Sequence, residues 1–99
     1  MHRIIYIGES ENIRLRIMTH EKNIEWKKYV RPGNYLCYNC TETLTDRVRI
    51  EAAYIYFHKP ICNIEYKNTF PFDTTTISSE GRTGLIEKYF TVYPQYSYV

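Results

Sequence analysis

Three side chains near the N-terminus are of the types that handle phosphate groups. Tyr6 follows a short apolar run, and Arg16 and His20 stand four residues apart in a segment of helical character. Residues with this spacing lie one above the other on a single helix face. A phenol, a guanidinium and an imidazole around one turn suit the binding of a phosphate. Considered alone, Arg16 and His20 are more commonly a solvated helix face, so the phosphate hypothesis needs further residues.

A carboxylate on the longest helical segment is a second candidate. Thr43 to Lys59 predicts a helix, with Thr43 or Thr45 as its N-cap and Pro60 as its stop. The helix is apolar around most of its circumference and must be covered on several sides. Its narrow polar strip consists of Arg47, Glu51, Tyr54 and His58. A carboxylate on such a helix is unfavourable unless it is paired or bound to metal. Glu51 therefore pairs with Arg47 or holds a cation.

The pattern of the whole chain predicts an α/β (α+β) domain, in which a small antiparallel sheet is flanked by helices. We expect residues 1–99 to form one domain, with a core of about residues 3–76 and a C-terminal extension of 77–99. Expected strands are Arg3 to Ile7, Tyr35 to Cys40 and Glu87 to Tyr93, and the expected helical segments besides Thr43 to Lys59 are Asn12 to His20, capped by Ser10, and an extension around Trp26. Pro60 to Asn63 and Phe70 to Asp73 are expected to be ordered loop, and Thr74 to Gly84 is rich in Thr, Ser and Gly.

Composition limits the class of protein without selecting a function. With 43% hydrophobic and 24% charged residues, the chain is expected to be globular and folded. A net charge of +2 permits contact with nucleic acid and does not demand it. The sequence has no apolar run long enough to span a membrane and no signal-peptide pattern, so we expect no membrane partner and a cytoplasmic location.

The three cysteines leave a metal alternative open. An odd number without a secretory signal indicates a reducing compartment. Cys37 and Cys40 have the spacing of a zinc knuckle or a redox pair, and His58 and Cys62 could supply two more ligands. Against this, Cys37 and Cys40 fall in a strand-like run without glycine, and no second CxxC is present. Buried thiols are the favoured interpretation.

The N-terminal residues resemble the second half of the signature of the GIY-YIG nucleases. Tyr6-Ile7-Gly8 matches the second tripeptide, Arg16 the arginine ten positions after its tyrosine, and His20 a histidine that some members carry one turn later. The first tripeptide, GIY, is not in this chain.

Later segments extend the resemblance over about Ile4 to Thr76. Arg49-Ile50-Glu51-Ala52-Ala53 is similar to the helix that bears the family's metal-binding glutamate. Lys59-Pro60-Ile61-Cys62-Asn63 resembles the segment that ends on the active-site asparagine. Phe70 to Thr76 is similar to a stretch in some bacterial members.

The resemblance implies a metal-dependent endonuclease that hydrolyses phosphodiester bonds in DNA. Glu51 would hold one Mg²⁺ or Mn²⁺ ion, and Arg16 would contact the scissile phosphate. Tyr6 would orient or deprotonate the attacking water, and His20 would assist proton transfer. Asn63 would fix a water or the loop near the metal. These roles predict that Tyr6, Arg16 and Glu51 converge on one concave surface.

The missing first tripeptide leaves three alternatives. The chain is a truncated product, or Glu87 to Tyr93 replaces the lost strand, or the domain is a catalytically weakened module that binds nucleic acid or protein without cutting. In the second alternative the tail pairs along Arg3 to Ile7 and brings Tyr89 or Tyr93 near Tyr6. That pairing lies within the chain or is swapped between two copies, which would make a homodimer through an exposed sheet edge.

Overall fold

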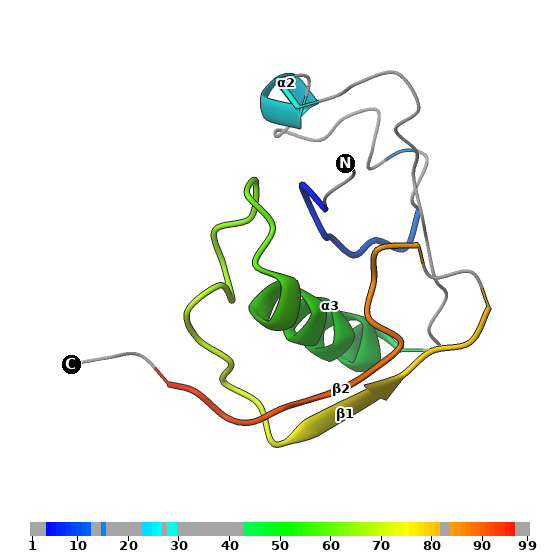
Figure 1. Cartoon of the computed structure of the whole chain (residues 1–99), viewed down its shortest axis with the longest axis vertical. Helices are drawn as coiled ribbons and strands as arrows, with labels where there is room; N and C mark the ends of the chain where they lie inside the picture. Colours follow the sequence, from blue (N-terminus) through cyan, green and yellow to red (C-terminus); the bar gives the residue numbers. More distant parts are fainter. Residues whose placement is uncertain are drawn as a thin grey trace.

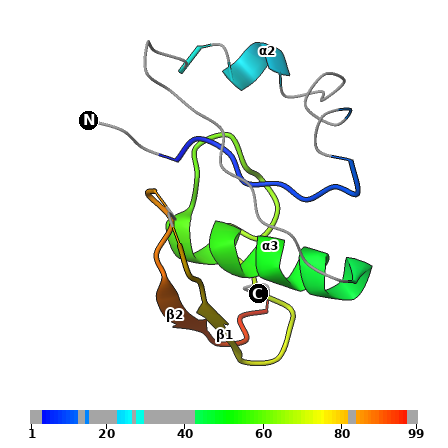
Figure 2. The same cartoon turned by 90° about the vertical axis from the view of Figure 1, so that its right-hand side faces the viewer.

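The computed structural model has the small mixed α/β fold that the sequence predicts, with one long helix and a two-stranded antiparallel sheet (Figure 1). It describes residues 4–12, 15, 23–26, 28–29, 43–81 and 84–96. Its elements are α2 (Asn23–Trp26), α3 (Leu44–His58), β1 (Thr75–Ser78) and β2 (Tyr89–Val92). Both views place α3 between the β1–β2 hairpin and residues 4–12 (Figure 2). In the described ranges, no helix combines the length and the apolarity needed to cross a membrane.

Helix α3 begins and ends where the sequence predicts. The Thr43 side chain accepts a hydrogen bond from the backbone N–H of Asp46 at 3.1 Å, which identifies Thr43 as the N-cap. At the other end, Lys59 takes a left-handed conformation with φ of 49° and donates its N–H to the Ile55 carbonyl. Pro60 follows and cannot continue the helix. The capping residues thus fix both ends.

One face of α3 packs on the hairpin and forms the core. Ala52 and Ala53 are fully buried, and their small side chains let the helix approach the sheet closely. The other buried members of this cluster are Phe70, Ile77, Phe90 and Val92. Phe57 and Tyr54 of the helix contact the Phe90 ring, with centroids 4.3 and 5.6 Å away. Burial of this apolar and aromatic surface holds the helix on the hairpin.

The hairpin confirms one expected strand and contains one that the sequence did not predict. β2 lies within Glu87 to Tyr93, with Phe90 and Val92 buried and Tyr89 and Tyr93 exposed. Its partner, β1, lies in the segment rich in Thr, Ser and Gly, and Thr75 pairs with Val92 and Ser78 with Tyr89. The β-branched residues Thr75 to Ile77 favour a strand despite the polarity of the segment.

Within one chain, the predicted pairing of the tail with the N-terminal segment is not found among the described residues. Residues 4–7 do not form a strand. The Ile5 carbonyl accepts from the Cys62 N–H at 2.8 Å, and both backbone groups of Ile7 bond to the side chain of Asn63. A side-chain amide satisfies one residue and cannot extend a ladder, so no sheet forms there. Within the chain β2 pairs with β1 instead, whereas pairing swapped between two copies stays a prediction.

Several expected features lie outside the described residues. These are most of Asn12 to His20, including Arg16 and His20, and the Tyr35 to Cys40 strand with Cys37 and Cys40. Where Asn12 is described, its Oδ1 accepts from the Leu15 N–H, the pattern of an N-cap, whereas Ser10 accepts from the Asn12 N–H. Helix α2 confirms helical structure around Trp26.

Arg49 ties α3 to the turn that leads into β1. Its Nε donates to Thr75 Oγ1 at 2.7 Å, and its Nη2 donates to the carbonyls of Thr74 at 3.1 Å and Asp73 at 3.5 Å. Thr75 is 8% exposed, and its hydroxyl also bonds to the Asp73 carbonyl. One guanidinium thereby fixes three residues of the turn.

Arg49→Met should lower the free energy of unfolding by about 1–3 kcal/mol, because buried Thr75 and two carbonyls lose a charged donor. Urea unfolding followed by circular dichroism measures this. Lys88→Met, at an exposed position, is the matched control and should change stability little. Equal stability of the two variants would contradict the role given to Arg49.

Candidate functional site

A pocket of about 710 Å³ lies between α3 and the N-terminal segment, by which we mean residues 4–12. Tyr6, Glu51 and Asn63, which the sequence singles out, all line it. Its other charged lining residues are Glu9, Glu11, Arg47 and Glu65. Three of the five candidate residues, far apart in the sequence, therefore share one concave surface.

Asn63 positions the N-terminal segment at this pocket. Its Oδ1 accepts from the Ile7 N–H at 2.9 Å, and its Nδ2 donates to the Ile7 carbonyl at 2.8 Å. The Asn63 residue is 7% exposed, and its own N–H bonds to the Pro60 carbonyl. Buried polar groups must be paired, so this amide and the Ile7 backbone satisfy each other. The contact fixes the residue that follows Tyr6.

The Tyr6 ring is held between Gly8 and Trp26. A Cβ atom on Gly8 would lie 2.8 Å from Tyr6 Cε2, which is too close for an unshifted side chain. Glycine at this position therefore lets the ring fold back over the backbone. The Trp26 ring contacts Tyr6 with centroids 5.0 Å apart. Both contacts fix how Tyr6 lines the pocket.

Glu51 lines the pocket from the middle of α3, and a tyrosine that the sequence did not single out lies near it. Burial raises the pKa of Tyr66, and the carboxylates of Glu65 and Glu51 raise it further. Tyr66 also contacts Phe72, with ring centroids 5.9 Å apart. A phenol with a raised pKa keeps its proton and acts as a hydrogen-bond donor. No spacing rule in the sequence connects Tyr66 with Glu51.

The donor chemistry of Glu51 fits a hard divalent cation. Mg²⁺ is commonly held by one or two carboxylates and keeps several waters, and an open polar pocket leaves room for them. Among the residues that the structure describes, no three His, Cys, Asp or Glu side chains converge to hold a metal. His58 and Cys62 thus join no such group there. Cys62 is 1% exposed, which confirms the buried thiol expected for this residue.

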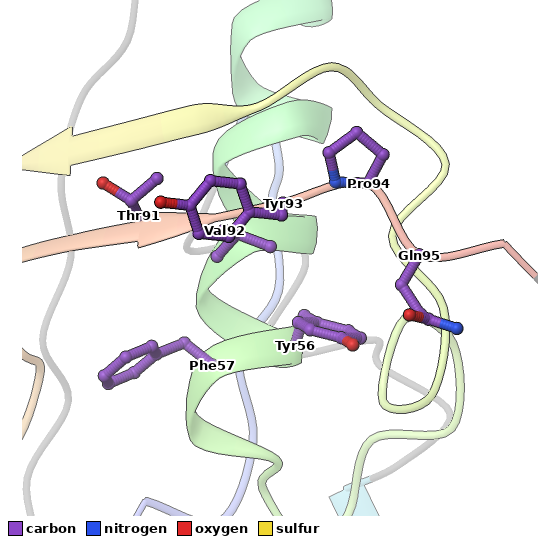
Figure 3. A pocket seen from close by; sticks show the side chains of 7 residues that line it. All are labelled: Tyr56, Phe57, Thr91, Val92, Tyr93, Pro94 and Gln95. Atoms are coloured by element: carbon purple, nitrogen blue, oxygen red, sulfur yellow. The ribbon is translucent and has the colours of Figure 1, made fainter.

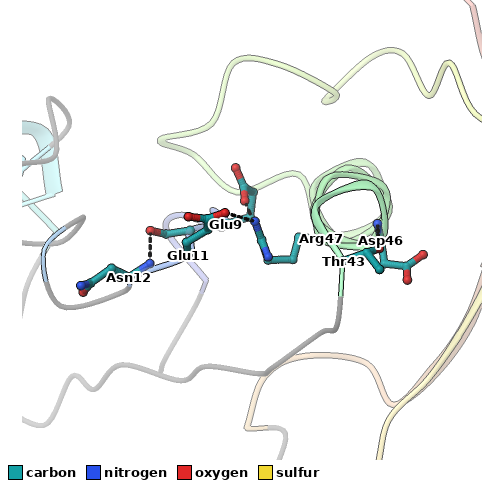
Figure 4. A network of polar contacts seen from close by, with 7 residues as sticks. Glu9, Glu11, Asn12, Thr43, Asp46 and Arg47 are labelled. Atoms are coloured by element: carbon teal, nitrogen blue, oxygen red, sulfur yellow. Dashed lines mark hydrogen bonds and ion pairs between the residues drawn. The ribbon is translucent and has the colours of Figure 1, made fainter.

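Arg47 connects α3 with the N-terminal segment across the pocket (Figure 4). Its Nε donates to Glu9 Oε2 at 3.2 Å, and its Nη2 lies 3.6 Å from Glu11 Oε1. Sequence spacing suggested Glu51 as the partner of Arg47, whereas the ion pairs described for Arg47 go to Glu9 and Glu11. This pairing was missed because it joins residues far apart in the sequence.

A second pocket, of about 280 Å³, lies between the C-terminal part of α3 and β2 with the residues that follow (Figure 3). Tyr56 and Phe57 line it from the helix, and Val92, Tyr93 and Pro94 from the other side. Its lining residues include no carboxylate, imidazole, amine, guanidinium or thiol. It therefore offers apolar contact and no evident chemistry.

Comparison with protein-family models finds no match, and comparisons with curated proteins and with solved structures find no similar protein. The relation to GIY-YIG nucleases consequently stands as a proposal that rests on the residues themselves.

Asn63→Ala should lower the free energy of unfolding by about 1–3 kcal/mol, because it leaves two backbone groups of Ile7 unsatisfied. It should also change the fluorescence of Trp26, the only tryptophan, because Tyr6 loses its fixed position beside it. Urea unfolding and emission spectra of the folded protein measure both effects. Asn68→Ala, at an exposed position, is the control. Unchanged stability and emission in Asn63→Ala would contradict the positioning role.

His58 bonds the end of α3 to the segment before β2. Its Nε2 accepts from the Glu87 N–H at 3.1 Å, so the neutral ring carries its proton on Nδ1. Phe57 and Phe90 contact the ring edge-on. Burial lowers the pKa of His58, and the Glu87 carboxylate partly opposes this. The folded protein thus favours the neutral imidazole.

The unfolded chain protonates the His58 ring more readily than the folded protein does, because the pKa of His58 is lowered by folding. The neutral His58 ring therefore contributes its full share of stability at pH values above the ordinary histidine pKa. This contribution should decrease as the pH falls from about 7 to about 5. In urea unfolding, wild type should lose more stability over this range than His58→Gln, which cannot titrate. Identical pH dependence of the two proteins would contradict a lowered pKa for His58.

Proposed function

We propose that the protein is a metal-dependent endonuclease that hydrolyses phosphodiester bonds in DNA. The observation that carries the proposal is the shared pocket. Tyr6, Glu51 and Asn63, to which the resemblance assigns nuclease roles, all line it. A cytoplasmic location accompanies the proposal.

Glu51 would hold one Mg²⁺ or Mn²⁺ ion, which supplies Lewis-acid stabilisation of charge on the phosphate. The pocket's own charge is a reason to expect metal dependence. Its lining residues include the four carboxylates of Glu9, Glu11, Glu51 and Glu65 and the single guanidinium of Arg47. A DNA phosphate that enters these surroundings meets net repulsion, which a bound cation reduces.

The remaining roles belong to side chains of the chain itself. Tyr6 would orient or deprotonate the attacking water, since a phenol both donates and accepts hydrogen bonds. Arg16 would bind the scissile phosphate and offset the charge that develops on it. His20 would assist proton transfer. Asn63 acts indirectly, because it holds Ile7 and through it the Tyr6 segment.

The runner-up is a catalytically weakened module that binds nucleic acid or protein without cutting. The observation that favours it is the pairing of Arg47 with Glu9 and Glu11, which occupies a cation of the pocket with the chain's own acids. Binding without cleavage under any divalent cation would select this alternative.

Glu51→Gln should abolish cleavage and leave the fold intact, because the amide keeps the shape and loses the charge that holds the cation. Nicking of supercoiled plasmid DNA in Mn²⁺ measures activity, and circular dichroism checks folding. Glu80→Gln, exposed and outside the pocket lining, is the control and should cleave as wild type does. Cleavage by Glu51→Gln at the wild-type rate would contradict the metal role.

Arg16→Ala should reduce the same nicking rate by about 10²–10³-fold, the usual effect of removing a donor to transition-state charge. Arg16→Lys should recover part of the loss, since it restores the charge without the planar fork. A wild-type rate in Arg16→Ala would exclude a role for this residue in catalysis.

A further inference from the structure

Arg47 has the position of a residue that binds the substrate. It lies one turn before Glu51 on α3, so the two side chains belong to the same helix face. Both line the pocket. Arg47 is held there by its ion pairs, and its side chain is 17% exposed.

Arg47 contacts two carboxylates, whose oxygens accept hydrogen bonds from a guanidinium in the same way as the oxygens of a phosphate. A guanidinium offers a planar fork of N–H groups that fits the oxygens of a carboxylate or a phosphate equally well. Glu9 accepts from its Nε, and Glu11 lies beside its Nη2. The two carboxylates thus occupy donors that a phosphate could use.

Of these two ion pairs, the one with Glu11 is the more readily exchanged, because the pair with Glu9 is partly buried. The Glu11 side chain is 85% exposed and that of Glu9 is 29% exposed. Exposed pairs contribute little to stability because water and salt compete for both partners. A polyanion that brings its own phosphate can therefore displace them.

The segment that carries both acids can shift without disturbing the core. Upstream, Ile5 and Ile7 are tied to Cys62 and Asn63. Beyond Gly8, the hydrogen bonds described for the segment's backbone N–H groups are local and exposed, such as that from the Asn12 N–H to Ser10 Oγ. A change in the Glu9 and Glu11 side chains breaks none of the anchoring bonds.

We propose that Arg47 is a phosphate-binding residue of the pocket and that Glu9 and Glu11 hold its guanidinium until a DNA phosphate replaces them. The inference rests on the proposed nuclease function and adds a self-inhibitory contact to it. Removal of the two acidic charges should strengthen DNA binding, and the gain should require Arg47.

The test is a double-mutant cycle on the full chain. The affinity for a short fluorescent DNA duplex is measured by anisotropy in EDTA, so that nothing is cleaved. Glu9→Gln with Glu11→Gln should bind about three- to tenfold more tightly than wild type. The slope of log affinity against log salt should become shallower by about one in Arg47→Met, as expected for the loss of one phosphate contact.

Two comparisons separate exchange at Arg47 from general repulsion. In an Arg47→Met background, the same two substitutions should change affinity less than about twofold. Glu80→Gln with Glu87→Gln removes equal charge from residues outside the pocket lining and should have a similarly small effect. A gain that persists without Arg47, or that the control pair reproduces, overturns the inference.

The proposed function fails separately. If wild type neither binds this duplex at low salt nor nicks plasmid in Mn²⁺, the nuclease proposal is overturned and the inference falls with it. If wild type nicks plasmid and the cycle shows no coupling to Arg47, only the inference is overturned.

Discussion

The pair of hydrogen bonds between the Asn63 amide and the Ile7 backbone is the interaction on which the site depends. They join the N-terminal segment to the turn that follows α3, although 56 residues separate the two partners. Each bond contributes about 1 kcal/mol net, but leaving the buried Asn63 amide unpaired is more unfavourable. Together with the bond from Cys62 to Ile5, they hold the N-terminal segment on the side of α3 opposite the hairpin.

Helix α3 connects the fold with the site because it is covered on two sides. Ala52 and Ala53 lie against the hairpin, whereas Ile55 is 2% exposed and lines the pocket on the other side. This explains why the helix is apolar around most of its circumference. Glu51 lies next to the alanines in sequence and lines the pocket, so burial of the alanines places Glu51 on the helix face that is turned to the pocket.

The sequence predicted what local chemistry determines. Thr43 and Pro60 delimited α3, and the alternation of apolar and polar residues identified β2, because caps and periodicity act over a few residues. It could not predict the strand partner of β2. The Thr-rich segment that forms β1 has loop-like composition, and its strand structure depends on pairing with Phe90 and Val92. The Asn63 side chain, and not a neighbouring strand, bonds to the backbone of Ile7. No pattern in the sequence indicates this contact.

For the site, the resemblance to GIY-YIG nucleases singled out Tyr6, Glu51 and Asn63, which line one pocket. Residue types and spacing did not select Arg47 as a partner of Glu9 and Glu11, because ion pairs between distant segments leave no periodic signal in the sequence.

The direct measurement of the central claim, that this pocket binds a divalent cation, is a Mn²⁺ titration of ¹⁵N-labelled protein followed by NMR. Paramagnetic broadening should be strongest at residues 6–8 and 50–52 and in the Asn63 side chain, and excess Mg²⁺ should reverse it. Broadening centred on the β1–β2 hairpin, or no selective broadening, would contradict the account.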